Sequence, residues 1–204
     1  ISSIKIEDTL WEPNTNSDVD DLRMNEMGIS VNDSIYTKDI IDSAYGITKD
    51  IYRNFITSMN NLTTDGIIKA WLPLPYDWRN NVAGIPDREI LDKIYSLATT
   101  SKTEKITILA HSNGGLLVKS LIEAMEKEGK SNLVDKVIFI AVPELGTAQA
   151  ILAMLHGHKQ SILGGLFLSE STARIFSQNV PGAYGLLPSK KFFEYNPFDI
   201  INDS

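Results

Sequence analysis

A serine at position 112 stands among small residues, in a pattern that suits a nucleophile. The surrounding run reads Ala-His-Ser-Asn-Gly-Gly. A serine that is exposed for attack must sit on a sharp turn between a strand and a helix, where crowding of the backbone demands small neighbours. Ala110 and Gly114 meet that demand at the two flanking positions. The spacing therefore predicts Ser112 as a nucleophile, with the backbone N–H of Asn113 directed at a developing oxyanion.

The sequence on both sides of this turn supports the prediction. Residues 105–110 form a short apolar run that is typical of a buried strand, and apolar residues recur at helical spacing over 114–128. An ordinary strand-to-helix turn is the alternative interpretation, because serine and glycine are common residues. The strand before the serine and the helix after it favour the nucleophile.

Further strands and helices are predicted to alternate around this unit. Apolar positions indicate helices over 49–60 and from Pro86 to Ala98, and strands over 67–74 and 134–142. Strands that are apolar on both faces and alternate with amphipathic helices indicate a parallel sheet covered on both sides. The expected fold class is α/β, a three-layer sandwich with a mostly parallel sheet.

The pattern changes after the last of these strands. Residues 147–188 are apolar but poor in strand signals, and glycines are scattered through them. We expect a helical cap there, over a core at about 36–146, the whole of 1–204 being one domain. The run from 162 to 168 has two interpretations, a mobile lid that meets lipid or a buried cap helix.

Composition excludes several classes of function. The chain has 204 residues, of which 22% are charged, a formal net charge of -7 and no cysteine. An acidic chain offers no basic footprint for nucleic acid, and without cysteine there is neither a disulfide framework nor a thiol nucleophile. No stretch is long and apolar enough to span a bilayer. Asp18, Asp20 and Asp21 lack the ligand spacing of a known calcium loop, so neither a metal nor a cofactor is predicted.

The chain resembles the lecithin–cholesterol acyltransferase-like branch of the α/β-hydrolases. The resemblance runs over most of the chain from Tyr36 to Ser189 and rests on five stretches: Tyr-Thr-Lys-Asp-Ile-Ile-Asp at 36–42, Pro-Tyr-Asp-Trp-Arg at 75–79, Ala-His-Ser-Asn-Gly-Gly at 110–115, Val-Pro-Glu-Leu-Gly-Thr at 142–147 and Ala-Tyr-Gly-Leu-Leu-Pro-Ser at 183–189. It implies an α/β-hydrolase fold and acyl transfer or ester hydrolysis on lipids, through a serine acyl-enzyme. Val142 and Glu144 stand where the family usually has threonine and histidine.

The base that must activate the serine is harder to find. A serine hydroxyl is a weak nucleophile until a base takes its proton, and in this fold the acid and then the histidine follow the serine in chain order. His111 precedes the serine and is directed away from its hydroxyl, so we interpret it as a packing residue. His156 and His158 fall in the predicted cap, where exposure to solvent is the favoured interpretation for each.

The acid of the triad is equally open. Asp135 lies at the amino end of its strand, whereas ligands bind at the carboxyl ends. Glu144 lies at the correct end, as a displaced acid or, preferably, as a solvated loop carboxylate, and no strand is apparent before Asp199. Residues 1–35 also lack the His-Gly loop that supplies the second oxyanion donor in this fold. We therefore hypothesise that the chain is a fragment, with the acid and the histidine beyond Ser204.

Three functions follow from these residues. The first is a serine-dependent ester hydrolase or O-acyltransferase that acts on a lipid or another acyl ester and touches lipid surfaces transiently through its cap. The second is a non-catalytic binding domain that kept the sheet, and the third is an amidase or peptidase with the same turn. Asp77 and Arg79 are interpreted as a brace for the loop around the site, the alternative being that Arg79 recognises a substrate head group.

Overall fold

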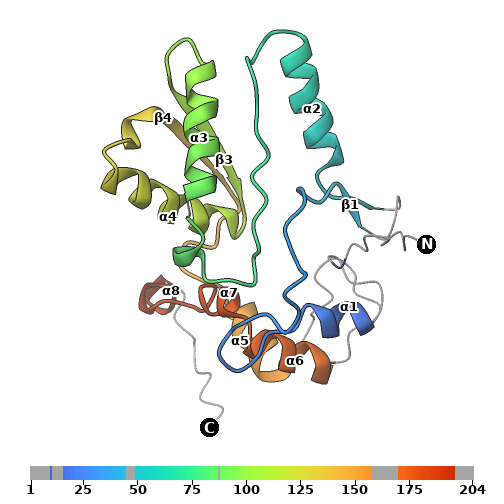
Figure 1. Cartoon of the computed structure of the whole chain (residues 1–204). Coiled ribbons are helices and arrows are strands. Elements are labelled where there is room, and N and C mark those ends of the chain that lie inside the picture. Colours follow the sequence, from blue (N-terminus) through green and yellow to red (C-terminus); the bar gives the residue numbers. More distant parts are fainter. Residues whose placement is uncertain (1–9, 11–15, 45–48, 87, 158–169, 196–204) are drawn as a thin grey trace, which may run out of the picture.

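The computed structural model describes residues 10, 16–44, 49–86, 88–157 and 170–195. The two longer strands and the helices around them lie at one end of the molecule, and most of the short helices gather at the other (Figure 1). The elements in chain order are α1 (Asn16–Asp21), β1 (Ser43–Ala44), β2 (Lys49–Asp50), α2 (Arg53–Thr64), η1 (Val82–Gly84), α3 (Arg88–Thr100), β3 (Ile106–His111), α4 (Gly114–Lys127), η2 (Ser131–Leu133), β4 (Val134–Ile140), α5 (Ala148–His156), α6 (Glu170–Gln178), α7 (Pro181–Tyr184) and α8 (Lys190–Tyr195).

The centre of the fold is the unit β3–α4–β4. The two strands are parallel, and their register runs from Ile106 opposite Val134 to His111 opposite Ile140. Helix α4 connects them, as parallel strands require a crossover. The strand predicted at 105–110 and the helix predicted at 114–128 are confirmed to within one residue at each end. The strand predicted at 134–142 ends at Ile140, because the backbone turns at Ala141, whose φ is 49°.

The hydrophobic core lies between this sheet and the two helices that cover it. Its buried members come from α3, β3 and α4 and are Leu91, Ile94, Ala98, Ile106, Leu117, Leu121 and Met125. Leu121 and Met125 are 1% and 0% exposed. Each large aliphatic side chain that is fully buried contributes about 1.5–3 kcal/mol relative to an exposed position, so this cluster dominates the stability of the unit.

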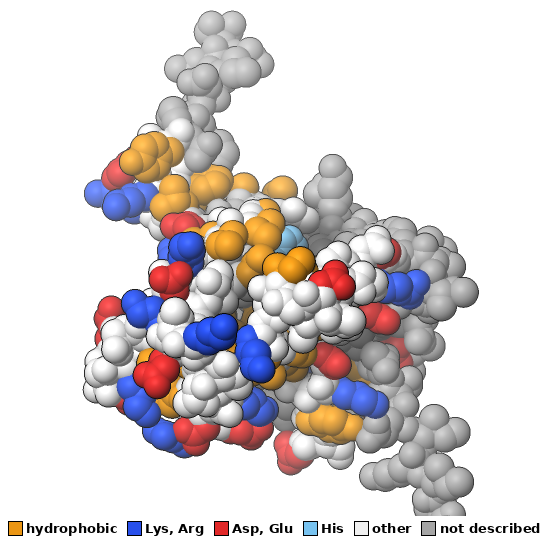
Figure 2. Space-filling view, turned by 90° about the horizontal axis from the view of Figure 1, so that it is seen from above, with side chains coloured by type: hydrophobic (Ala, Val, Ile, Leu, Met, Phe, Trp, Pro, Cys, Tyr) orange, Lys and Arg blue, Asp and Glu red, His pale blue; other side chains and the backbone are white. Residues whose placement is uncertain are grey.

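The opposite face of the two-stranded sheet is open within the described residues. Strand residues alternate between faces, and Leu109, Ile138 and Ile140 are 44%, 46% and 43% exposed. Hydrophobic side chains are also exposed on the face seen from above in Figure 2. Parallel sheets are ordinarily covered on both faces, and the described residues supply that cover on one.

The strand predicted at 67–74 is wrong. Residues 67–77 form an extended segment that runs between α2 and α3 without joining a sheet (Figure 1). A strand needs a hydrogen-bonded neighbour, and a cavity lies between this segment and β3. Pro73 and Pro75 also lack the N–H groups that a ladder uses. The helix predicted at 49–60 forms about one turn later, as α2.

The described residues after 147 form helices, as predicted. Helices α5 and α6 pack together, and Gln178 Nε2 donates to the Met154 carbonyl oxygen at 2.8 Å. Helix α5 ends at Gly157, whose φ of 65° suits glycine. His158 and the run at 162–168 lie outside the described residues. None of the helices in the described ranges is long and apolar enough to cross a membrane.

Candidate active site

Ser112 occupies a strained turn between β3 and α4. Its φ is 53°, in the left-handed region that residues with a side chain rarely adopt. Its N–H donates to the Ile140 carbonyl oxygen at 2.9 Å, and its own carbonyl oxygen accepts from the Gly115 N–H at 3.0 Å. The turn is thus held on one side by the end of β4 and on the other by the first turn of α4. This is the strand-to-helix geometry expected for a nucleophile elbow.

Close packing at this turn falls on a different glycine from the one predicted. A Cβ on Gly114 would meet nothing within 4 Å outside its own helix. A Cβ on Gly115 would collide with the side chain of Val142, just after β4. A small residue is therefore required where α4 approaches the loop after β4, and Gly115 is the residue at that position. Ala110 is buried at 5% exposure, as predicted for a crowded flank.

Asn113 follows the serine at the start of α4. Among the described residues, the structure shows no acceptor for its backbone N–H, which leaves this donor available at the positive end of the helix. Its side chain does not cap the helix, and Oδ1 is buried without a hydrogen bond from any described residue. A buried acceptor left unpaired costs about 1–3 kcal/mol, so interactions other than a hydrogen bond to Oδ1 hold the Asn113 side chain in this position.

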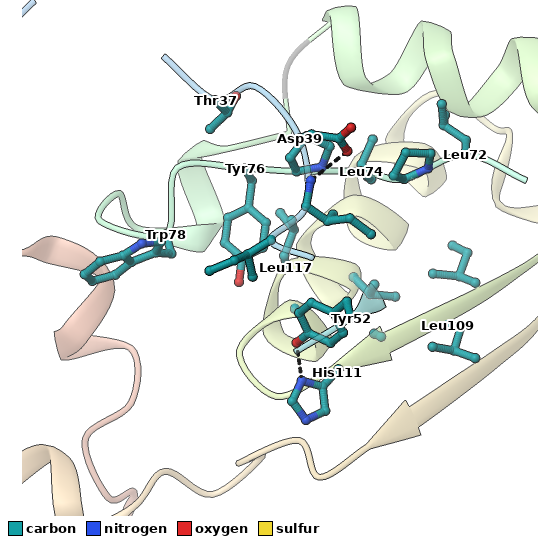
Figure 3. A pocket seen from close by; sticks show the side chains of 18 of the residues that line it. Thr37, Asp39, Tyr52, Leu72, Leu74, Tyr76, Trp78, Leu109, His111 and Leu117 are labelled. Carbon is teal, nitrogen blue, oxygen red and sulfur yellow. Dashed lines mark hydrogen bonds between the residues drawn. The ribbon is translucent and has the colours of Figure 1, made fainter. Parts of the chain in front are cut away.

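The turn opens into a cavity of about 1850 Å³ between β3 and the extended segment 67–77. Aliphatic side chains line much of it, among them Leu72, Leu74, Leu109 and Leu117. Polar side chains line it at several places, and Ser112 and Asn113 at the carboxyl end of β3 are among them, as are Tyr52 and Tyr76. Figure 3 shows the Tyr52 and Tyr76 rings entering the pocket from different segments of the chain. The site thus combines a large apolar space with a few hydrogen-bonding groups beside the serine.

Both tyrosines stay protonated at neutral pH. Burial raises the pKa of Tyr76 to about 12, against a smaller lowering by the Asn113 side chain, and the nearby Tyr52 raises it further. Burial also raises the pKa of Tyr52. Low polarity disfavours the phenolate form, so each hydroxyl remains a hydrogen-bond donor in the cavity.

His111 is held by Tyr52 instead of by the serine. Tyr52 Oη lies 2.6 Å from His111 Nδ1, and the two rings meet edge to face at 5.7 Å between centroids (Figure 3). The expectation that His111 packs, and is directed away from the Ser112 hydroxyl, agrees with this contact, although its side chain is exposed. In the part of the chain that the structure describes, no histidine or carboxylate hydrogen-bonds to Ser112 Oγ.

The other predicted candidates lie apart from the serine. His156 is exposed in the last turn of α5 and does not line the cavity. Glu144 pairs with Lys119 of α4 at 3.1 Å, both side chains being about half exposed. Asp135, at the amino end of β4, lies 3.9 Å from Lys136. Such exposed pairs contribute little to stability. Asp199 lies outside the described residues.

Arg79 braces the loop that follows the extended segment. Its side chain is 2% exposed and bonds to both carboxylate oxygens of Asp77, at 2.9 and 2.7 Å. Its guanidinium also donates to the Leu22 carbonyl oxygen at 3.0 Å, and its own carbonyl oxygen accepts from the Gly182 N–H at 2.8 Å. A buried arginine with these partners ties three distant segments together and is not available to a substrate head group.

The acidic residues near the amino end do not gather as metal ligands. Asp20 lies 3.5 Å from Arg23, and Asp21 accepts from Asn32 at 3.1 Å. Across the described ranges, no three His, Cys, Asp or Glu side chains meet in a way that could hold a metal ion.

Sequence reasoning missed the two tyrosines and the Asn113 side chain. Tyr76 belongs to the Pro-Tyr-Asp-Trp-Arg stretch, which drew attention for Asp77 and Arg79, and Tyr52 read as one more apolar position of a helix. Tyr76 carried a signal, a phenol in a predicted loop at the carboxyl edge of the sheet, where polar groups of α/β proteins converge, whereas Tyr52 carried none.

Comparison with known proteins places the chain in a family. The family model described as "Lecithin:cholesterol acyltransferase" matches residues 10–201, almost the entire sequence. No curated protein matches the chain. The family implies the α/β-hydrolase fold, of which the described residues carry a part, and an acyltransferase or hydrolase class with lipid substrates. The chain therefore belongs to the lecithin:cholesterol acyltransferase family.

Proposed function

We propose that this chain carries the nucleophile of a serine-dependent acyl hydrolase or O-acyltransferase that acts on lipid esters. Ser112 Oγ attacks the ester carbonyl, and the Asn113 N–H donates a hydrogen bond to the oxyanion that forms. Collapse of this intermediate releases the alcohol and leaves the acyl group on Ser112. Water or a second alcohol then takes the acyl group.

The observation that carries the proposal is the backbone at Ser112. A serine held at a φ of 53° carries strain of about 1–3 kcal/mol, which persists only where the surroundings impose it. Here the hydrogen bond from the Ser112 N–H to the end of β4 holds the turn on one side. On the other side, Val142 lies so close to α4 that a Cβ at position 115 would collide with it. The same turn lies at the carboxyl ends of parallel strands and borders the large apolar cavity, which suits an acyl chain.

In our proposal the histidine and the acid of the triad lie outside the residues that the structure describes. The described residues offer no base at Ser112 Oγ, so the proton has to leave through a group that the rest of the protein supplies. The same observation favours a second candidate, a binding domain that retains the elbow without the chemistry.

A fluorophosphonate probe separates the two candidates. We expect the full-length protein that carries this sequence to be labelled, and Ser112→Ala to lose the label. Ser96→Ala is the matched control, since Ser96 is an exposed serine of α3, and it should label as the unmodified protein does. A folded full-length protein that takes no label, or one that keeps its label in Ser112→Ala, would overturn the enzyme proposal.

A further inference from the structure

Three exposed apolar side chains gather on one turn in the loop after α1. Met27, Ile29 and Val31 are 79%, 54% and 57% exposed, and we call these three side chains the apolar tip. None of them lines the cavity at Ser112. Single exposed hydrophobic residues are common on soluble proteins, whereas several that stand together mark an interaction surface.

The turn beneath the apolar tip is held by its own hydrogen bonds. Asn25 Oδ1 accepts from the Met27 and Ile29 N–H groups at 2.9 and 3.1 Å, and the Asn25 N–H donates to the Ile29 carbonyl oxygen at 2.8 Å. The turn also packs on α7, where a Cβ on Gly28 would collide with Pro181. These contacts fix the backbone, so the exposed apolar side chains are not needed to hold the turn.

The same turn is tied to the wall of the cavity. The Arg79 guanidinium, which pairs with Asp77 at 2.7 Å, donates to Ser30 Oγ at 3.3 Å. Just after the turn the chain enters the lining of the cavity at Asn32, and residues 34–42 continue that lining. A surface that contacts the apolar tip is therefore held beside the cavity.

The charges around the apolar tip select the kind of surface. Residues 20–33 carry one arginine and four carboxylates, which are Asp20, Asp21, Glu26 and Asp33. Carboxylates are repelled by anionic lipids. A phosphatidylcholine layer presents its cationic ammonium groups outermost, and these complement the carboxylates. A folded protein partner would need a pocket shaped to the tip, whereas a fluid lipid layer accepts apolar side chains of any shape.

We propose that the apolar tip inserts into a zwitterionic lipid surface and holds the cavity beside it. This inference rests on the proposed function, because lipid esters reside in such surfaces. The three apolar side chains enter the boundary between head groups and acyl chains, while Glu26 and Asp33 stay among the head groups. The contact is reversible, since three side chains bury little apolar area.

Vesicles of diether phosphatidylcholine test the proposal without turnover, because this lipid has no ester bond. We expect the full-length protein that carries this sequence to sediment with the vesicles. The double variant Met27→Ser/Ile29→Ser should bind about tenfold more weakly or worse, because two apolar side chains no longer leave water.

Ile67→Ser is the matched control for the loss of an exposed isoleucine. Ile67 is 69% exposed, in the bend that follows α2. That bend and the blue loop after α1 lie at opposite ends of the molecule (Figure 1). Binding of Ile67→Ser to the vesicles should therefore equal that of the unmodified protein.

Salt and lipid charge test the nature of the contact. Binding should persist in about 1 M salt, where the screening length is about 3 Å, because an apolar contact is not screened. Partial replacement of the lipid by diether phosphatidylglycerol should weaken binding. Tighter binding to these anionic vesicles that is lost in salt would overturn the proposal.

The remaining outcomes separate this inference from the proposed function. Unmodified protein that does not bind the vesicles, or a double variant that binds as tightly, overturns the role of the apolar tip. A lower free energy of unfolding in the double variant would mean that another part of the full-length protein covers these side chains, which also overturns it. Absence of the fluorophosphonate label at Ser112 counts against the proposed function and leaves the vesicle result standing.

Discussion

Two extended apolar runs of this chain differ in whether they join a sheet. Strand β3 pairs with β4 along its whole length and ends at Ser112, whereas segment 67–77 is extended but joins no sheet in the described part of the chain. Both runs are rich in aliphatic residues and precede a loop that carries polar side chains. An apolar run becomes a strand only where a second segment lies beside it, because its backbone N–H and C=O groups need hydrogen-bond partners. The sequence of one run does not identify that second segment.

The two regions also differ in what they contribute. The side chains that pack on β3 from α4, such as Leu121, are fully buried, while Ile67 and Leu72 of the segment are 69% and 38% exposed. Only the carboxyl end of the segment, with Leu74 and Tyr76, reaches the core. The β3–α4–β4 unit thus holds the serine in place, and the segment builds a wall of the cavity.

The largest predicted contrast is one of stability. Leu121→Ala should lower the free energy of unfolding by about 2–5 kcal/mol, because it opens a void in the core. Leu72→Ala should lower it by less than about 1 kcal/mol, since this side chain is already partly in water. Urea unfolding measures both. Comparable losses at the two positions would contradict the difference in burial between β3–α4–β4 and the extended segment.

The two glycines after Ser112 should differ in their tolerance of a side chain. Gly115→Ala should cost about 1–3 kcal/mol, because its methyl group meets Val142, whereas Gly114→Ala should be neutral or stabilising by up to about 1 kcal/mol. Val142→Ala in the Gly115→Ala background should restore part of the loss. Chemical denaturation compares these variants, and equal effects at the two glycines would contradict the close packing of Gly115 against Val142.

Tyr76 tests whether the extended segment docks on the β3–α4–β4 unit. Its folded-state pKa of about 12 exceeds the ordinary value of 10.0, so between these pH values the unfolded chain releases a proton that the folded chain keeps. The stability from this group is therefore complete below pH 10 and falls as the pH rises towards 12, by on the order of 2 kcal/mol. Tyr76→Phe should lose stability less steeply over that range. Identical slopes of stability against pH for the two proteins would mean that the Tyr76 hydroxyl is solvated in the folded protein.

The smallest effect concerns strain at the serine. Ser112→Gly should be more stable than Ser112→Ala by about 1 kcal/mol, because glycine adopts a positive φ without penalty. Ser120, inside α4, is the matched control, and there the order should reverse, with alanine the more stable. Thermal unfolding of the four variants gives both orders. If the glycine and alanine variants ranked in the same order of stability at both positions, the backbone at Ser112 would not be strained.

Much of the fold followed from local pattern. Strand β3, helix α4 and strand β4 were predictable because the partners lie close in sequence and the periodicity of each is clear. The segment 67–77 was not, because its failure to pair depends on what lies beside it in space. Ser112 was predictable from small neighbours on a turn, but the crowding at Gly115 depends on Val142, which comes from another loop.

The tyrosines lay beyond sequence reasoning for the same reason. The approach of Tyr76 to Asn113 joins residues 37 positions apart, and that of Tyr52 to His111 spans 59. Neither pair forms a motif along the chain. Contacts of this kind arise only once the sheet edge, the extended segment and α2 are placed together.

In the proposed reaction Ser112 accepts the acyl group, so isolation of the acyl-enzyme is the decisive experiment. The full-length protein is mixed with an activated medium-chain ester, quenched in acid and digested, and its peptides are analysed by mass spectrometry. We expect one acyl group on the peptide that contains Ser112, and none on that peptide in Ser112→Ala. An acyl group on a different residue, or hydrolysis that continues in Ser112→Ala, would contradict it.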